Sequence, residues 1–155
     1  MSRLVAYLIR FAVILAGYVV ASLAASAFLN ILFLGYFGYA PEPGHPTIAT
    51  ALYFSVPFVA LFVAYFAFMP AAVAILIGEV LGRRDWLFYA LGGAAVAIVF
   101  LGFVHNVGDA SFDVTATNVR LAVVGCGMVG GIFYWLSAGR WAGSWRREPL
   151  PDPDL

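Results

Sequence analysis

The chain has 155 residues, of which 64% are hydrophobic and 10% are charged, and its formal net charge is zero. A typical soluble domain carries about 25% charged residues, so this composition excludes a water-soluble globular fold. The neutral charge argues against nucleic acid as a partner, and we expect one domain whose solvent is the lipid bilayer.

Four long apolar stretches follow one another and predict membrane spans at 8–34, 50–81, 86–105 and 118–138. A helix needs about 20 apolar residues to cross the hydrocarbon, and each stretch reaches that length. We therefore predict an all-α membrane protein, a four-helix up-down bundle formed by residues 1–147. Residues 148–155 contain three prolines and two aspartates, and we predict a disordered cytoplasmic tail there.

The first predicted span contains a possible signal-peptide cleavage triplet, Ala25-Ser26-Ala27. The apolar stretch is long and continues past this triplet, so we expect a retained membrane anchor. The first two spans hold about 30 residues each and exceed the hydrocarbon thickness, so they must tilt, kink or project from the outer surface. Pro57 and Pro70 give the second span two places to bend.

The second span carries small residues on one face and aromatic residues on another. The small residues recur at alternating spacings of four and three, at Ala60, Ala64, Ala67, Ala71, Ala74 and Gly78. The aromatic residues recur every four positions, at Phe54, Phe58, Phe62 and Phe66. Small residues allow close helix packing in lipid, and the fourth span offers a Gly127-x-x-x-Gly131 motif for the same use. We expect these seams to pack within the bundle and the aromatic row to face lipid or a partner.

All eight basic residues are arginines, and seven of them lie near the ends of the spans in three clusters: Arg3 and Arg10; Arg83 and Arg84; and Arg140, Arg146 and Arg147. The intervening segments 35–48 and 105–119 contain no Lys or Arg. Cytoplasmic loops carry an excess of Lys and Arg, so this pattern predicts that both termini and the 82–85 turn are cytoplasmic. All four tryptophans lie beside the same ends, where indole rings favour the headgroup layer.

Glu79 is the one acidic residue inside a predicted span. Acids at membrane depth are functional candidates, but Arg83 lies four residues further along, in the favourable orientation for a helical ion pair. We therefore predict a structural Glu79–Arg83 pair at the interface. For Arg10 we predict an extended side chain that reaches the cytoplasmic headgroups.

Candidate metal ligands lie near the other ends of the spans. His105, Asp109 and Asp113 are spaced by four residues, and His45 lies in the other loop on that side. Imidazole and carboxylate groups can together hold a divalent ion. Gly108 opposes a helix there, and the spacing is looser than in ordinary metal motifs. We therefore predict no metal, no cofactor and no catalytic residue.

The segment Tyr134–Gly143, with its aromatic anchor, glycines and arginine, resembles the end of many small uncharacterised four-span bacterial inner-membrane proteins. The resemblance implies a multi-pass protein of the bacterial inner membrane and no particular activity. From the residues we favour a non-catalytic subunit or scaffold, in contact with a membrane-protein partner or a second copy. The alternatives left open are a small oligomeric permease or channel and, less favoured, an enzyme acting on lipid or quinone.

Overall fold

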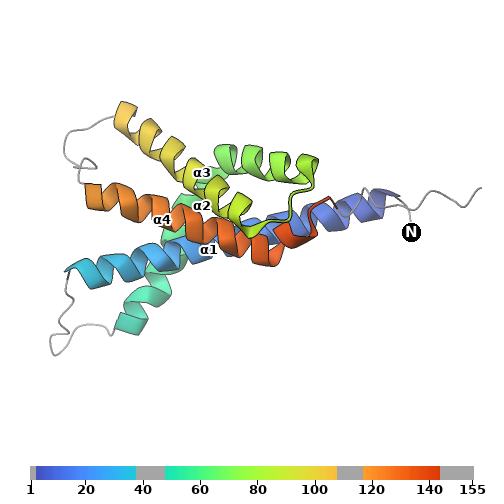
Figure 1. Ribbon diagram of the computed structural model, residues 1–155. Helices are drawn as coiled ribbons and strands as arrows, with labels where there is room; N and C mark the ends of the chain where they lie inside the picture. Colours follow the sequence, from blue (N-terminus) through green and yellow to red (C-terminus); the bar gives the residue numbers. More distant parts are fainter. Residues whose placement is uncertain (1–2, 38–47, 108–116, 144–155) are drawn as a thin grey trace, which may run out of the picture.

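The computed structural model describes residues 3–37, 48–107 and 117–143 (Figure 1). The helices are α1 (Arg3–Phe37), α2 (Ile48–Leu81), α3 (Trp86–Val107) and α4 (Thr117–Ser137), followed by a short 3-10 helix, Gly139–Trp141. All four α-helices are long and apolar enough to cross a membrane. This confirms the prediction of an all-helical protein with four candidate spans.

The first two helices are longer than a bilayer crossing requires. α1 has 35 residues and α2 has 34; at 1.5 Å per residue each is about 50 Å long, against about 30 Å of hydrocarbon. α2 continues through Pro57 and Pro70 as one helix and changes direction along its length (Figure 1). The first turns of α1 extend past the other helices (Figure 1).

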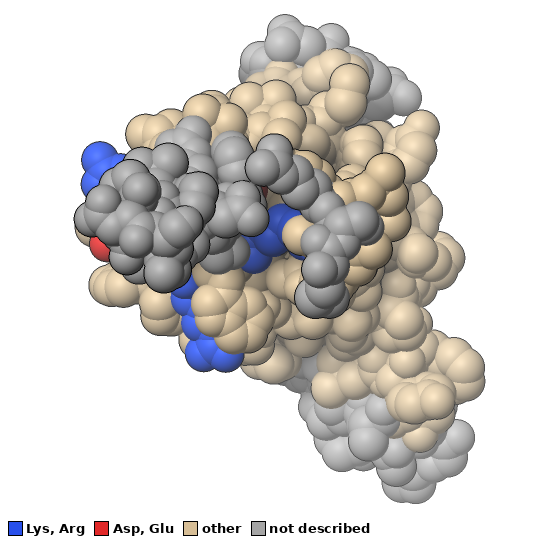
Figure 2. Space-filling view, turned by 90° about the vertical axis from the view of Figure 1, so that its right-hand side faces the viewer, with Lys and Arg blue, Asp and Glu red and all other residues tan. Residues whose placement is uncertain are grey.

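One end of the molecule gathers three segments that are distant in sequence. Arg10 of α1 contacts Glu79 near the end of α2, and Arg84 donates to the carbonyl oxygen of Ala142 beyond α4. We call this the arginine end, defined by Arg10, Glu79, the 82–85 turn and residues 137–143. Figure 2 views the molecule from this end and shows blue arginine atoms among tan residues.

α3 and α4 cross at backbone contact. A Cβ atom added at Gly93 would overlap the carbonyl oxygen of Gly127, and one added at Gly127 would overlap that of Gly93. A Cβ atom at Gly131 would overlap the carbonyl oxygen of Tyr89. Gly127 and Gly131 of the predicted seam therefore lie against α3, where the absence of side chains lets the backbones approach.

α4 also packs closely against α1. A Cβ atom at Gly17 would lie 2.7 Å from the Cβ of Ala138, and one at Gly130 would lie 3.3 Å from the carbonyl oxygen of Ala21. Ala138 is fully buried. α4 is therefore held between α1 and α3 by glycine on both of its contact faces.

α1 and α2 are joined by hydrogen bonds from polar side chains. The hydroxyl of Tyr18 donates to the carbonyl oxygen of Ala64 at 2.6 Å, and that of Ser26 donates to the carbonyl oxygen of Val56 at 2.7 Å. Further along, Ser55 donates to the side-chain oxygen of Asn30 at 2.7 Å. Hydrogen bonds between helices contribute to helix association in lipid, where the hydrophobic driving force is weak.

The α3–α4 crossing gives a first prediction. Gly93→Ala should destabilise the protein by about 1–3 kcal/mol, because the added methyl group forces two backbones apart. The single cysteine, Cys126, is 8% exposed, so its reaction with a maleimide dye on heating reports unfolding. Gly102→Ala on the same helix is the control, because a Cβ atom there meets nothing within 4 Å. Equal labelling temperatures for the two variants would contradict this crossing.

Candidate functional site

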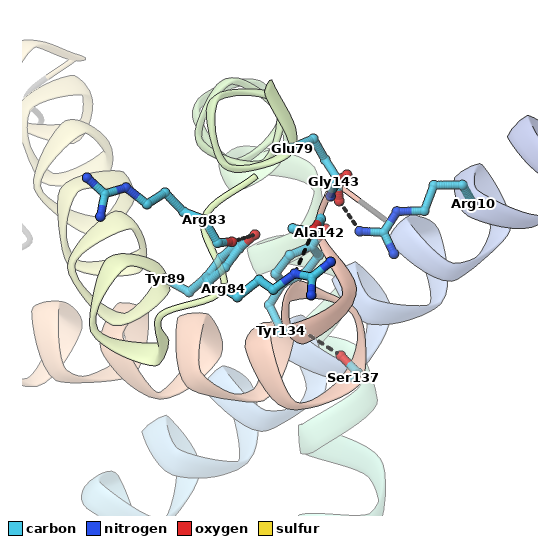
Figure 3. Close-up of polar contacts among 9 residues, drawn as sticks. All are labelled: Arg10, Glu79, Arg83, Arg84, Tyr89, Tyr134, Ser137, Ala142 and Gly143. Atoms are coloured by element: carbon cyan, nitrogen blue, oxygen red, sulfur yellow. Dashed lines mark hydrogen bonds and ion pairs between the residues drawn. The ribbon is translucent and has the colours of Figure 1, made fainter. Parts of the chain in front are cut away.

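The charged centre of the arginine end is the carboxylate of Glu79. The guanidinium group of Arg10 donates to its Oε1, and the backbone N–H of Gly143 donates to its Oε2 at 3.3 Å. The two charged side chains are 14% and 10% exposed. The pair thus joins α1, α2 and the segment after α4 through one acidic group (Figure 3).

Two glycines in the left-handed region shape the backbone around this carboxylate. Gly82 has φ 63° and ends α2, while Gly143 has φ 66° and presents its N–H to Glu79. A Cβ atom at Gly143 would also lie 2.9 Å from the Cα of Gly82. Glycine adopts this conformation without steric cost, so both the turn and the close approach favour it here.

Aromatic side chains fix the neighbouring backbone. The indole N–H of Trp135 donates to the carbonyl oxygen of Arg84 at 2.6 Å, and the hydroxyl of Tyr89 donates to that of Arg83 at 3.2 Å. The rings of Tyr89 and Tyr134 lie 5.5 Å apart. These bonds satisfy the carbonyl groups of Arg83 and Arg84 and hold the turn against α3 and α4.

The structure corrects the predicted partner of Glu79. α2 ends at Leu81, and the turn at Gly82 carries Arg83 away from the helical face on which an i,i+4 pair would form. Figure 3 shows the Arg83 side chain directed away from Glu79. Arg83 lies 3.5 Å from Asp85, and both of these side chains are largely exposed.

Arg10 also differs from its predicted role. Its side chain is nearly buried and bonds to Glu79 instead of extending to headgroups. The sequence held one signal for this contact, since both residues are charges placed inside apolar stretches near the same predicted membrane face. The N–H of Gly143 had no comparable signal, because a backbone donor is common to almost every residue.

Two buried polar atoms of the described region lack a hydrogen-bond partner: the Nε of Arg10 and the hydroxyl oxygen of Tyr134. Buried polar groups are nearly always paired in folded proteins, so each such atom calls for an explanation. The contacts of Glu79 hold α1, α2 and the segment after α4 together, because both of its carboxylate oxygens are engaged within the chain.

The candidate metal ligands cannot be assembled from the described residues. His45, Asp109 and Asp113 lie outside them, and His105 falls in the last turn of α3 at a position whose side chain is not described. Within residues 3–37, 48–107 and 117–143, no group of three or more His, Cys, Asp or Glu side chains could hold a metal ion.

The small-residue row of α2 divides into three parts. Ala60 is 6% exposed, Ala64 accepts the bond from Tyr18, and Gly78 meets the ring of Tyr89. The three residues of the row between Ala64 and Gly78 instead line a partly open cavity of about 500 Å³; they are Ala67, Ala71 and Ala74. On another face, the aromatic row of Phe54, Phe58, Phe62 and Phe66 is 48–68% exposed.

Comparison of the chain with protein-family models, with curated proteins and with solved structures finds no match.

The charge pair gives a second prediction. Glu79→Gln should destabilise the protein by about 3 kcal/mol, because it leaves the charge of Arg10 buried without its counter-ion. Arg83→Gln should change stability by less than about 0.5 kcal/mol, because that side chain is exposed. Dye labelling of Cys126 on heating measures both variants.

A double substitution separates loss of the pair from loss of its packing. Arg10→Met combined with Glu79→Leu removes both charges and keeps the volume, and should recover most of the stability lost in Glu79→Gln. A double variant less stable than Glu79→Gln would contradict a desolvated pair, as would an effect of Arg83→Gln equal to that of Glu79→Gln.

Proposed function

We propose that the chain is a non-catalytic subunit or scaffold of a complex in the bacterial inner membrane. Its helices form an up-down bundle with both termini in the cytoplasm. The contacts at the arginine end support this arrangement, since they join the start of α1, the α2–α3 turn and the end of α4. The excess of arginine at these ends is the topological signal.

The observation that carries the scaffold proposal is the aromatic row of α2. Its rings contact one another along the helix: the rings of Phe58 and Phe62 are tilted with centroids 5.1 Å apart, and those of Phe62 and Phe66 are stacked with centroids 6.5 Å apart. Aromatic side chains have few rotatable bonds and dominate many interfaces. Solvation by lipid does not require an ordered aromatic row. Contact with another transmembrane helix accounts for it better.

The polar residues of the spans favour a scaffold over a permease. A solute pathway needs polar groups that are available to the solute. Here Tyr18, Ser26 and Ser55 donate to groups within the bundle, and Glu79 is engaged by Arg10 and Gly143. These polar groups thus serve contacts within the bundle, and Glu79, the acid of a possible enzyme site at the arginine end, is already engaged.

Reporter fusions test the topology. A fluorescent protein that matures in the cytoplasm should be active at either terminus, and alkaline phosphatase should be active when fused after residue 44 or 112. Phosphatase activity at either terminus would overturn the proposed threading.

Affinity purification in a mild detergent, followed by mass spectrometry and size measurement, tests the scaffold role. A stoichiometric partner or second copy should be retained by the wild type and lost in Phe58→Ala/Phe62→Ala, because removing rings from an interface core weakens binding strongly. Phe103→Ala on α3 is the matched control, since Phe103 is 65% exposed but lies outside the row. A monomer without partners, or equal loss in the control, would refute the role of the row.

A further inference from the structure

The segment after α4 is held by hydrogen bonds to two different parts of the arginine end. The Nε of Arg84 donates to the carbonyl oxygen of Ala142 at 3.1 Å. The N–H of Gly143, the next residue, donates to one carboxylate oxygen of Glu79, whose other oxygen accepts from Arg10 (Figure 3). Ala142 and Gly143 are both buried. A buried dipeptide therefore links Arg84 to the Arg10–Glu79 pair.

The arginine end carries more positive charge than its described acids neutralise. The structure describes two acidic side chains there, and each is paired with its own arginine, as Glu79 with Arg10 and as Asp85 with Arg83. Arg84 and Arg140 have no acidic partner among the described residues. Guanidinium atoms lie at the surface of this end (Figure 2). The charge balance therefore favours an anion beside Arg84 and Arg140.

Arg84 is held in place before any anion arrives. Its carbonyl oxygen accepts from the indole N–H of Trp135 at 2.6 Å, and its Nε is bonded to Ala142. Its two terminal nitrogens have no partner among the described residues, and neither is one of the buried unpaired atoms of that region. Both are therefore left to an acceptor outside the described chain. A guanidinium group presents its N–H donors in a planar fork that matches the oxygens of a phosphate group.

Arg140 lies against an aromatic ring at the surface. Its guanidinium carbon is 4.6 Å from the ring centroid of Trp141, and Trp141 is 50% exposed. Both residues belong to the short 3-10 helix that directly precedes Ala142, so Arg140 is two positions from the carbonyl group that holds Arg84. Exposed indole rings favour the headgroup layer of a bilayer. The anion that fits this place is therefore one that a membrane surface presents.

We propose that Arg84 and Arg140 bind the phosphate of an anionic phospholipid headgroup. A phosphodiester offers two unesterified oxygens, which suit the fork of Arg84. Basic groups at a membrane surface attract anionic lipids, whereas the ammonium group of a zwitterionic headgroup would be repelled by the same two arginines. The inference rests on the proposed membrane insertion and not on a protein partner, and the reporter fusions test insertion separately.

Native mass spectrometry of the purified, delipidated protein tests the site, with phosphatidylglycerol as the probe. Arg84→Gln should reduce lipid retention about tenfold, because hydrogen bonds between two charged groups are lost. Arg83→Gln is the matched control, since it removes the same charge from the neighbouring residue, whose side chain is largely exposed and paired with Asp85. Equal losses in the two variants overturn the site, because net charge alone would then govern retention.

Arg140→Gln supplies an independent variant, because this side chain is exposed. It should also reduce retention of phosphatidylglycerol, and dye labelling of Cys126 shows whether each variant is folded. If Arg84→Gln does not fold, unchanged retention in Arg140→Gln overturns the site. Phosphatidylcholine is the zwitterionic comparison, and equal retention of the two lipids by the wild type overturns the preference for an anionic headgroup.

The experiment also separates the headgroup from two other anions. Displacement of phosphatidylglycerol by a stoichiometric amount of inorganic phosphate overturns the assignment in favour of free phosphate. The chain's own tail contains Glu148, Asp152 and Asp154. Retention that is absent in the wild type and appears only in Glu148→Gln/Asp152→Asn/Asp154→Asn overturns the assignment in favour of the tail.

Discussion

Hydrocarbon supplies no hydrogen bonds, so a chain that lives in it must satisfy its polar groups within itself. The structure meets this constraint by pairing an acidic group of α2 with a basic group of α1. Arg10 and Glu79 neutralise each other at the arginine end, and Gly143 adds a backbone donor. Uncharged hydroxyl groups then serve along the spans, where Tyr18 and Ser26 bond to carbonyl oxygens of α2.

The same constraint explains why the two halves of the bundle pack differently. α3 and α4 approach through Gly93, Gly127 and Gly131 until their backbones touch, so close packing holds this pair. α1 and α2 instead rely on polar hydrogen bonds, and α2 meets α3 at Gly78 against the ring of Tyr89, at Ala74 near Gly92, and at Phe66 near Phe100. The cavity lies beside these contacts, along Ala67, Ala71 and Ala74 of α2.

The number and extent of the helices could be predicted from sequence, because about 20 apolar residues between arginine clusters leave few alternatives in lipid. The partner of Glu79 could not be. The prediction of Arg83 rested on a helix continuing through Gly82, but the left-handed turn there ends α2 at Leu81. Arg10 is 69 positions away from Glu79 in the sequence. Their contact depends on the axial offset between α1 and α2, which local residue spacing does not encode.

The small-residue row of α2 shows a similar limit of sequence patterns. A regular spacing indicates that a helix can be approached closely, but it does not say what approaches it. Ala60 and Gly78 are covered by this chain, whereas Ala71 and Ala74 border an open cavity. Side chains larger than alanine at those two positions would have narrowed the space. Lipid solvates an apolar wall without a large penalty. The volume beside these two residues nevertheless restricts the shape of whatever occupies it, a restriction that bulk lipid alone does not require.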